Sequence, residues 1–177
     1  MGEKILTVHE VKDEKFLRRK AAAFDFAKFR RAEIGALIAR MKRTMRRANG
    51  VGLSANQIGL DAAMFVAEVP DGQGGRKFYA IFNPRIEKIV PEQVVKEEGC
   101  LSVPRAYGEV SRHERITISG LDRNGKPIKV KAWGLLARVF QHEIDHLNGK
   151  LFIDRAKQVR TVPVAEALAR REKAARQ

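Results

Sequence analysis

The hydrophobic and polar positions between residues 26 and 45 repeat with the spacing of an α-helix. Apolar side chains recur every three or four residues, at Phe26, Phe29, Ile34, Leu37, Ile38, Met41 and Met45. Arginine and lysine fill many of the positions between them, so the stripe predicts an amphipathic helix with its apolar face in a core. Asp25 is a suitable N-cap, and Asn49-Gly50 is expected to end the helix.

From residue 62 to residue 131 the pattern changes to short apolar and β-branched runs, which are typical of strands. Four runs are expected as strands: Ala63–Val69, Phe78–Pro84, Arg115–Leu121 and Ile128–Trp133. The last two flank a turn at 122–125 and are predicted to pair as a hairpin. A short extended segment, Lys4–Val8, precedes the first helix.

Two more helices are expected after the strands. The first begins at Gly134, is rich in leucine, valine and phenylalanine, and ends at Asn148-Gly149, where glycine can adopt the left-handed conformation. The second is basic and covers Val164–Ala175. Antiparallel sheets around a central helix, with an N-terminal and a C-terminal helix, predict an α+β fold. We expect residues 1–177 to form one domain that ends in a basic tail, 155–177.

The net charge of +14 is concentrated in Lys12–Arg47 and Arg155–Gln177. Such surfaces attract polyanions such as nucleic acid, although a solubilising surface with no partner explains the charge equally well. The chain has no motif for specific DNA binding. It has no apolar stretch long enough to cross a bilayer and no basic-then-apolar leader, so a cytoplasmic location without membrane contact is expected.

The second predicted helix contains His142-Glu143-Ile144-Asp145-His146, an H-E-x-x-H motif. Residues four apart on a helix differ by about 40° in direction and about 6 Å in rise, so both imidazoles can reach one metal ion. Glu143 then lies beside the metal without binding it. Two solvated histidines would be the alternative, but the helix is otherwise apolar, and polar groups inside it need partners.

Cys100 is the only cysteine, and it is the best candidate for a third metal ligand. A Cys-His-His set with one open position has the form of a catalytic metal site. Its thiolate suits a ferrous ion as well as zinc. Residues 50–57, Gly-Val-Gly-Leu-Ser-Ala-Asn-Gln, permit close backbone approach to a ligand, but taken alone they favour a structural loop.

Three segments taken together are more specific. G-V-G-L-S-A-N-Q at 50–57, E-G-C-L-S at 98–102 and Q-H-E-I-D-H at 141–146 resemble, in this order and spacing, the three signature motifs of the peptide deformylase family. The similarity spans roughly residues 4 to 154. Ser54 stands where the family often has alanine, and residues 105–111 differ from the best-known bacterial form, so the residue there that contacts the substrate backbone is not assigned.

The resemblance implies a role for each motif residue. Cys100, His142 and His146 would hold one divalent metal, Fe²⁺ as the native ion, with Zn²⁺, Ni²⁺ or Co²⁺ as possible substitutes. Glu143 would be the general acid/base, and Gln57 and the Leu101 N–H would form the oxyanion hole. The methionine pocket would be lined by Val51, Gly52, Leu135 and Val139. Asp145 would pair with Arg112 and brace the metal-binding helix.

The implied reaction is removal of the formyl group from the N-terminal formyl-methionine of nascent peptides, with release of formate. We expect the ribosome to be a partner through the basic surfaces, including Arg170, Arg171, Lys173 and Arg176 of the tail. A solvated, frayed terminus is the alternative for the tail. Three other functions remain: a zinc endopeptidase, a hydrolase with Cys100 as nucleophile, and a basic ribosome- or RNA-binding module with a structural metal.

Overall fold

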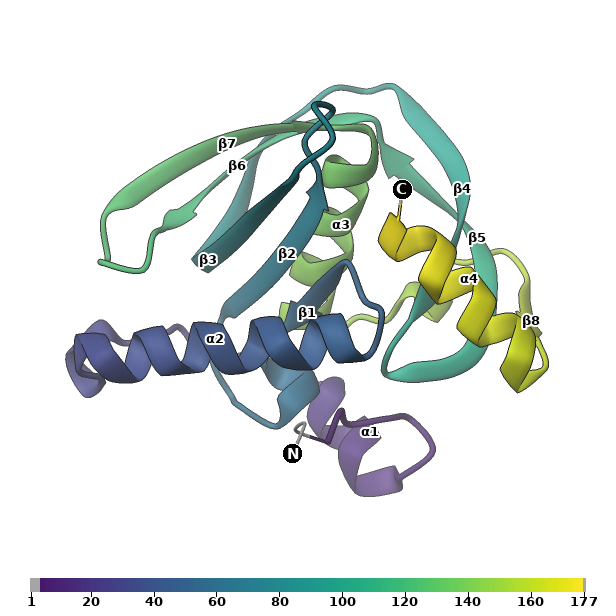
Figure 1. Ribbon diagram of the computed structural model, residues 1–177, viewed down its shortest axis with the longest axis horizontal. Helices are drawn as coiled ribbons and strands as arrows, with labels where there is room; N and C mark the ends of the chain where they lie inside the picture. Colours follow the sequence, from purple (N-terminus) through teal and green to yellow (C-terminus); the bar gives the residue numbers. More distant parts are fainter. Residues whose placement is uncertain (1–3, 177) are drawn as a thin grey trace.

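The computed structural model describes residues 4–176, with side chains described up to residue 173, so the side chain of Arg176 in the basic tail lies outside the described part. Two antiparallel sheets and one central helix organise this part of the chain (Figure 1). The larger sheet has the order β1-β2-β3-β6-β7, from Gly52–Ser54, Met64–Pro70, Arg76–Ile89, Arg115–Leu121 and Pro127–Trp133. The smaller sheet has the order β4-β5-β8, from Gln93–Cys100, Val103–His113 and Val159–Thr161.

Helix α3 (Gly134–Leu147) packs on one face of the larger sheet, and α2 (Arg31–Arg47) covers the other face (Figure 1). Strand β2 shows why both faces are buried. Phe65 and Ala67 point toward the cluster that contains α3, whereas the alternate residues Met64 and Val66 join the cluster that contains α2. The α+β prediction is therefore confirmed, and α3 is the central helix.

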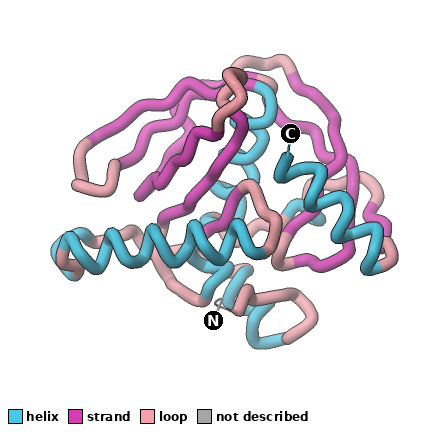
Figure 2. The backbone as a smooth tube through the Cα atoms, in the orientation of Figure 1, coloured by secondary structure: helices cyan, strands magenta, loops and turns pink. Residues whose placement is uncertain are grey.

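The smaller sheet lies beside α3 (Figure 2). Its apolar residues, among them Val103 and Val110, pack with Leu151 and Phe152 at the start of a 3-10 helix, Phe152–Asp154, that follows α3. Helix α4 (Val164–Arg176) lies against this sheet. None of the helices within residues 4–176 combines the length and the apolar composition needed to cross a bilayer.

The predicted N-terminal helix begins later than its apolar stripe suggested. Phe26 and Phe29 do not belong to α2: Asp25 accepts a hydrogen bond from the Ala27 N–H at 3.0 Å and caps a separate 3-10 helix, Phe26–Lys28. The reason is packing, because the rings of Phe24, Phe26, Phe29 and Phe82 stack edge-on and face-on in one cluster. Helix α2 ends at Arg47, and Asn49 adopts the left-handed conformation with φ 53°.

Several other elements differ from the prediction. A short helix, α1 (Val11–Leu17), a 3-10 helix at Ala55–Ile58 and the long β4–β5 hairpin were not predicted. The extended segment 4–8 forms no strand, but its backbone joins two signature motifs. The Leu6 N–H donates to the Gln57 carbonyl at 2.8 Å, and the Val8 N–H donates to the Ser102 carbonyl at 2.9 Å.

Candidate metal centre

Helix α3 and the end of β4 bring three metal-binding side chains together. The possible ligand atoms of Cys100, His142 and His146 all lie within 4.8 Å of one another, and Cys100 Sγ is 3.1 Å from His146 Nε2. Metal–sulfur and metal–nitrogen bonds of about 2.0–2.3 Å around one tetrahedral ion require donor separations of about 3–4 Å. The donor types therefore fit one divalent transition metal ion, and the separation of Cys100 Sγ from His146 Nε2 lies within this range.

The surroundings of Cys100 favour the thiolate. Burial raises the pKa of the thiol, but His146 and His142 outweigh this effect and hold the pKa well below its usual range. The Ser102 N–H also donates to the sulfur at 3.3 Å. Because a metal ligand must be deprotonated, this environment prepares the sulfur for coordination.

A buried network of charges holds His142 in place. Its Nδ1 lies 3.0 Å from Glu98 Oε2, which leaves Nε2 to face the other ligands. Arg112 donates to both oxygens of Glu98 at 2.9 Å. His142 and Arg112 outweigh the opposing effect of burial and strongly lower the pKa of the Glu98 carboxyl. Sequence reasoning did not single out Glu98, although it stands two residues before Cys100.

The same network continues to Asp145, which directly precedes His146 in the chain. Arg112 Nη1 lies 2.5 Å from Asp145 Oδ2, so the structure brings together the pair that the resemblance implied. Arg155 donates to both oxygens of Asp145 at 2.6 and 2.7 Å, and Arg138 donates to Glu98 at 2.8 Å. Arg138 and Arg155 are further positioning residues that the sequence did not indicate, because only the fold brings them to these carboxylates.

Glu143 is buried at the base of the site, beside the histidines. Ser54 Oγ donates to Glu143 Oε2 at 2.5 Å, so the residue that differs from the usual alanine contacts the predicted acid/base directly. Burial raises the pKa of Glu143, although the two histidines and Ser54 oppose this effect. A side chain at Gly52 would not fit, since its Cβ would lie 2.3 Å from Glu143 Oε1.

Gln57 lies on the short helix that follows β1, with its side chain held at both ends. Its Oε1 accepts a hydrogen bond from the Ser54 N–H at 2.8 Å, and its Nε2 donates to Ser102 Oγ at 3.1 Å. The same Nε2 lies 3.7 Å from Cys100 Sγ. Leu101 directly follows Cys100 in the chain, and it lines one pocket together with Gln57 and Cys100. The two predicted oxyanion donors are thus adjacent to the candidate metal ligands.

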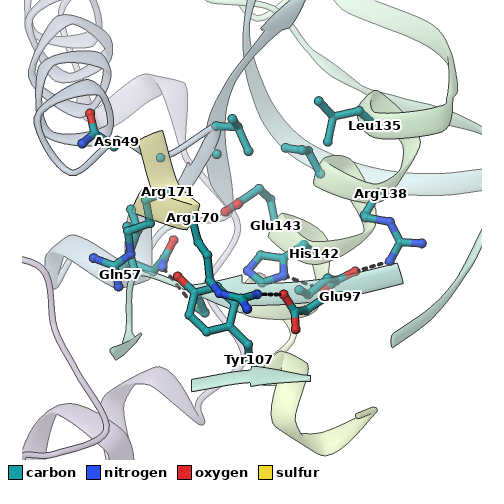
Figure 3. Close-up of a pocket in the computed structure, with 18 residues that line it drawn as sticks. Asn49, Gln57, Glu97, Tyr107, Leu135, Arg138, His142, Glu143, Arg170 and Arg171 are labelled. Carbon is teal, nitrogen blue, oxygen red and sulfur yellow. Dashed lines mark hydrogen bonds and ion pairs between the residues drawn. The ribbon is translucent and has the colours of Figure 1, made fainter. Parts of the chain in front are cut away.

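One pocket contains the predicted substrate-binding residues (Figure 3). Val51, Gly52, Leu135 and Val139 all line it, together with Gln57, Cys100, Leu101, His142 and Glu143. Asp145, Arg112 and His146 are not among the lining residues and lie behind it. Sequence reasoning missed Glu97 and did not place Arg170 and Arg171 of α4 at this pocket. It left the contact residue within 105–111 open, and Tyr107 is the residue of that range that lines the pocket.

The fold and the site together indicate a metal-dependent hydrolase: the histidines of an H-E-x-x-H helix converge with a cysteine beside a pocket that is lined by Gln57 and Glu143. Comparison with known proteins specifies the class further. The family model of polypeptide deformylase matches residues 4–162. The chain belongs to the polypeptide deformylase family.

Individual relatives agree with this assignment. The chain is 46% identical over 123 residues to a peptide deformylase of Halothermothrix orenii, covering 70% of this chain and 77% of that protein. It is 40% identical over 151 residues to a peptide deformylase of Thermodesulfovibrio yellowstonii, covering 85% and 88%. The crystal structure of peptide deformylase from Thermotoga maritima superposes with a TM-score of 0.76 at 36% identity, covering 89% of this chain and 99% of that chain.

A Met-Ala-Ser-bound crystal structure of a class I type b peptide deformylase from Acinetobacter baumannii has a TM-score of 0.79 at 29% identity, covering 88% and 98% of the two chains. The protein is therefore an enzyme, a hydrolase that removes the N-formyl group from nascent polypeptides. Neither an endopeptidase nor an RNA-binding module is supported by these similarities.

Proposed function

We propose that residues 1–177 act as one catalytic domain in which Cys100, His142 and His146 bind a divalent metal ion and Glu143 transfers the protons of deformylation. The observation that carries this proposal is the convergence of the three donors within 4.8 Å, beside the carboxylate of Glu143. A bound metal supplies a Lewis acid that polarises the formyl carbonyl and lowers the pKa of water. We propose Fe²⁺ as the native ion, since the thiolate suits it, with Zn²⁺, Ni²⁺ or Co²⁺ able to replace it.

Glu143 is suited to proton transfer by its surroundings. The Ser54 hydroxyl holds Oε2, while Oε1 lies next to Gly52 at the pocket and is available to the attacking water. Glu143 accepts the proton of that water as it adds to the formyl carbon. It then delivers a proton to the amine of methionine, which leaves with formate as the second product.

Gln57 and Leu101 stabilise the oxygen of the formyl group as it becomes negative. The Gln57 amide needs little reorganisation, because Ser54 N–H and Ser102 Oγ already fix its orientation. Hydrogen bonds from Gln57 Nε2 and from the Leu101 N–H to the formyl oxygen would be stronger in the tetrahedral intermediate than in the substrate. Removing one such donor typically costs about 10²–10³ in kcat.

The apolar part of the pocket takes the methionine side chain. Val51, Leu135 and Val139 offer apolar surface, and Gly52 has no side chain to displace the Glu143 carboxylate. The Acinetobacter relative, whose structure was determined with Met-Ala-Ser, supports a peptide that begins with methionine as the ligand of this pocket. We propose N-formyl-methionyl peptides as the substrates.

The test is formate release from formyl-Met-Ala-Ser, compared with acetyl-Met-Ala-Ser as a matched substrate. We expect formate from the first peptide and no hydrolysis of the second. Metal analysis of protein purified without oxygen should find about one equivalent of iron. Release of internal peptide fragments instead of formate would contradict the proposal, and zinc as the only metal would contradict the choice of iron.

We further propose that the enzyme works in the cytoplasm and contacts the ribosome through basic residues of α2 and α4. Exposed residues such as Arg43, Arg47 and Lys173 support this, because ribosomal RNA is a dense polyanion. Co-sedimentation with ribosomes across a salt series should weaken in Lys173→Glu and in an Arg43→Glu, Arg47→Glu double variant. Lys129→Glu on the larger sheet is the matched control. Equal binding and equal salt dependence in all four proteins would contradict the proposal.

A further inference from the structure

Helix α4 is attached to the smaller sheet at the pocket itself. The hydroxyl group of Tyr107, on β5, donates to the carbonyl of Ala167 at 3.1 Å. Ala167 is only 4% exposed and packs with Tyr107 and Val162, so the helix has a small apolar contact as well as its charges. Because Tyr107 also lines the pocket, this contact places α4 at the pocket's edge (Figure 3).

Ion pairs with Glu97 also hold α4 at the edge of the pocket. The Arg170 guanidinium pairs with Glu97 and lies over the Tyr107 ring, 5.1 Å from its centroid. Arg160, on β8, donates to the second oxygen of Glu97 at 2.6 Å. Arg170 also bonds Glu166, one turn earlier in α4, at 2.7–2.9 Å. The charge of Arg170 is therefore used to attach the helix and to form part of the pocket wall.

Among the described residues that line the pocket, one cation has no charged partner. Glu97 is neutralised by Arg170 and Arg160, and Glu98 by Arg112 and Arg138. Arg171 lines the same pocket and is half-buried. Among the residues with described side chains, none forms an ion pair or a hydrogen bond with Arg171. A half-buried guanidinium at a substrate pocket, with no anionic partner among the described side chains, is suited to an anion on the substrate.

We propose that Arg171 is a specificity-determining residue that favours a carboxylate side chain in the peptide segment that follows formyl-methionine. This inference rests on the proposed function, which places the formyl group at the metal ligands. The rest of the bound peptide must then extend out of the pocket, and α4 forms one wall of this path. An aspartate or glutamate that passes Arg171 gains an ion pair, whereas a lysine at the same position meets a like charge.

The test uses formyl-Met pentapeptides that are identical except for glutamate, glutamine or lysine at the second, third or fourth position. Formate release gives kcat/KM for each peptide. At one of these positions glutamate should be preferred over glutamine by about 2- to 5-fold at low salt, the effect expected for a partly exposed ion pair. The preference should decrease as salt is added. Arg171→Gln should abolish it, and Arg171→Glu should reverse it in favour of lysine.

Lys173→Gln is the matched control, because it removes the same charge from the same helix at an exposed position outside the pocket lining. It should keep the preference for glutamate. Equal rates for all three residues at every position in the wild type would overturn the inference, as would a preference that survives in Arg171→Gln. An equal loss in Lys173→Gln would assign the effect to the general positive field and also overturn it. No formate from any peptide would instead refute the proposed function.

Discussion

Arg112 on β5 and Asp145 on α3 form a buried ion pair, with Arg112 Nη1 2.5 Å from Asp145 Oδ2. Arg112 is only 3% exposed and also binds both oxygens of Glu98. Glu98 contacts His142, and Asp145 directly precedes His146 in the chain. One guanidinium thus fixes two carboxylates, each of which stands beside a different candidate metal ligand.

Arg112→Gln should weaken metal binding by about 10- to 100-fold, the usual cost of removing a group that orients metal ligands. It should also lower the free energy of unfolding by about 3 kcal/mol, because the buried carboxylates lose a charged partner. Competition with a chelator measures the first effect and urea denaturation the second. Lys129→Gln, which breaks the exposed pair with Glu87, is the control and should change neither. A folded Arg112→Gln protein with wild-type metal affinity would contradict the positioning role.

Glu143→Gln should keep its metal and lose about 10²- to 10⁴-fold in kcat, since an amide cannot transfer the proton. The Ser54 hydroxyl can still donate to the amide oxygen, so the side chain should keep its position. Metal content and formate release, measured on the same sample, separate the two properties. Near-normal turnover in the metal-loaded variant would show that another group transfers the proton.

Cys100→Ala should lose metal and activity together, because one of three protein ligands is removed. Cys100→Ser should bind metal more weakly than the wild type, since a hydroxyl is a poorer ligand than the thiolate favoured here. Metal analysis after gel filtration distinguishes the variants. A Cys100→Ala protein with full metal content and no activity would support the alternative in which Cys100 is the nucleophile.

Glu68 on β2 gives a prediction for acid stability. Hydrogen bonds from Arg46 on α2, at 2.7 and 2.8 Å, lower the pKa of this carboxyl although burial raises it. A carboxyl whose pKa is lowered in the folded state stabilises the protein above the unfolded pKa of about 4.3, and this stabilisation disappears as the pH falls through the folded value. Glu68→Gln should therefore cost about 1 kcal/mol at pH 7 and nothing at strongly acid pH.

Urea denaturation of the wild type and Glu68→Gln between pH 7 and pH 2 measures this difference. The two unfolding free energies should begin to converge as the pH falls below the unfolded pKa of about 4.3 and become equal only below the folded pKa, where the protonated wild-type carboxyl resembles the amide. A difference that stays constant across the range would assign the effect to packing and not to the charge of Glu68.

Sequence patterns located the parts of the fold that have local signals. Helix α3 has a regular apolar stripe and a left-handed Gly149 at its end, with φ 72°, and the H-E-x-x-H spacing places both histidines on one face. The β4–β5 hairpin was missed because its inward-facing residues include Glu98 and Arg112. Buried charged residues interrupt the alternation of apolar and polar positions by which a strand is recognised. Their burial is explained only by the partners that α3 brings beside them.

The C-terminal helix also shows that local sequence patterns do not predict long-range contacts. Its sequence correctly predicted a basic helix, but the contact between Tyr107 and Ala167 depends on residues 60 positions apart. No local pattern reports such a contact. Arg170 and Arg171 are neighbours in the chain and both line the pocket. Only the fold shows that Arg170 pairs with Glu97, whereas Arg171 has no ion pair among the described side chains.

The candidate ligands also join separate parts of the molecule. Cys100 ends a strand of the smaller sheet, whereas both histidines belong to the helix that packs on the larger sheet. A bound ion would therefore act as a cross-link between two structural layers, closing a loop of more than 40 residues much as a disulfide does. Amide hydrogens of β4 and β5 should then exchange with deuterium more slowly as metal is added, while those of β2 and β3, already fixed between α2 and α3, should change little. A bound ion would on this basis raise the free energy needed to open the smaller sheet, so metal supply would affect the stability of the native enzyme as well as its chemistry.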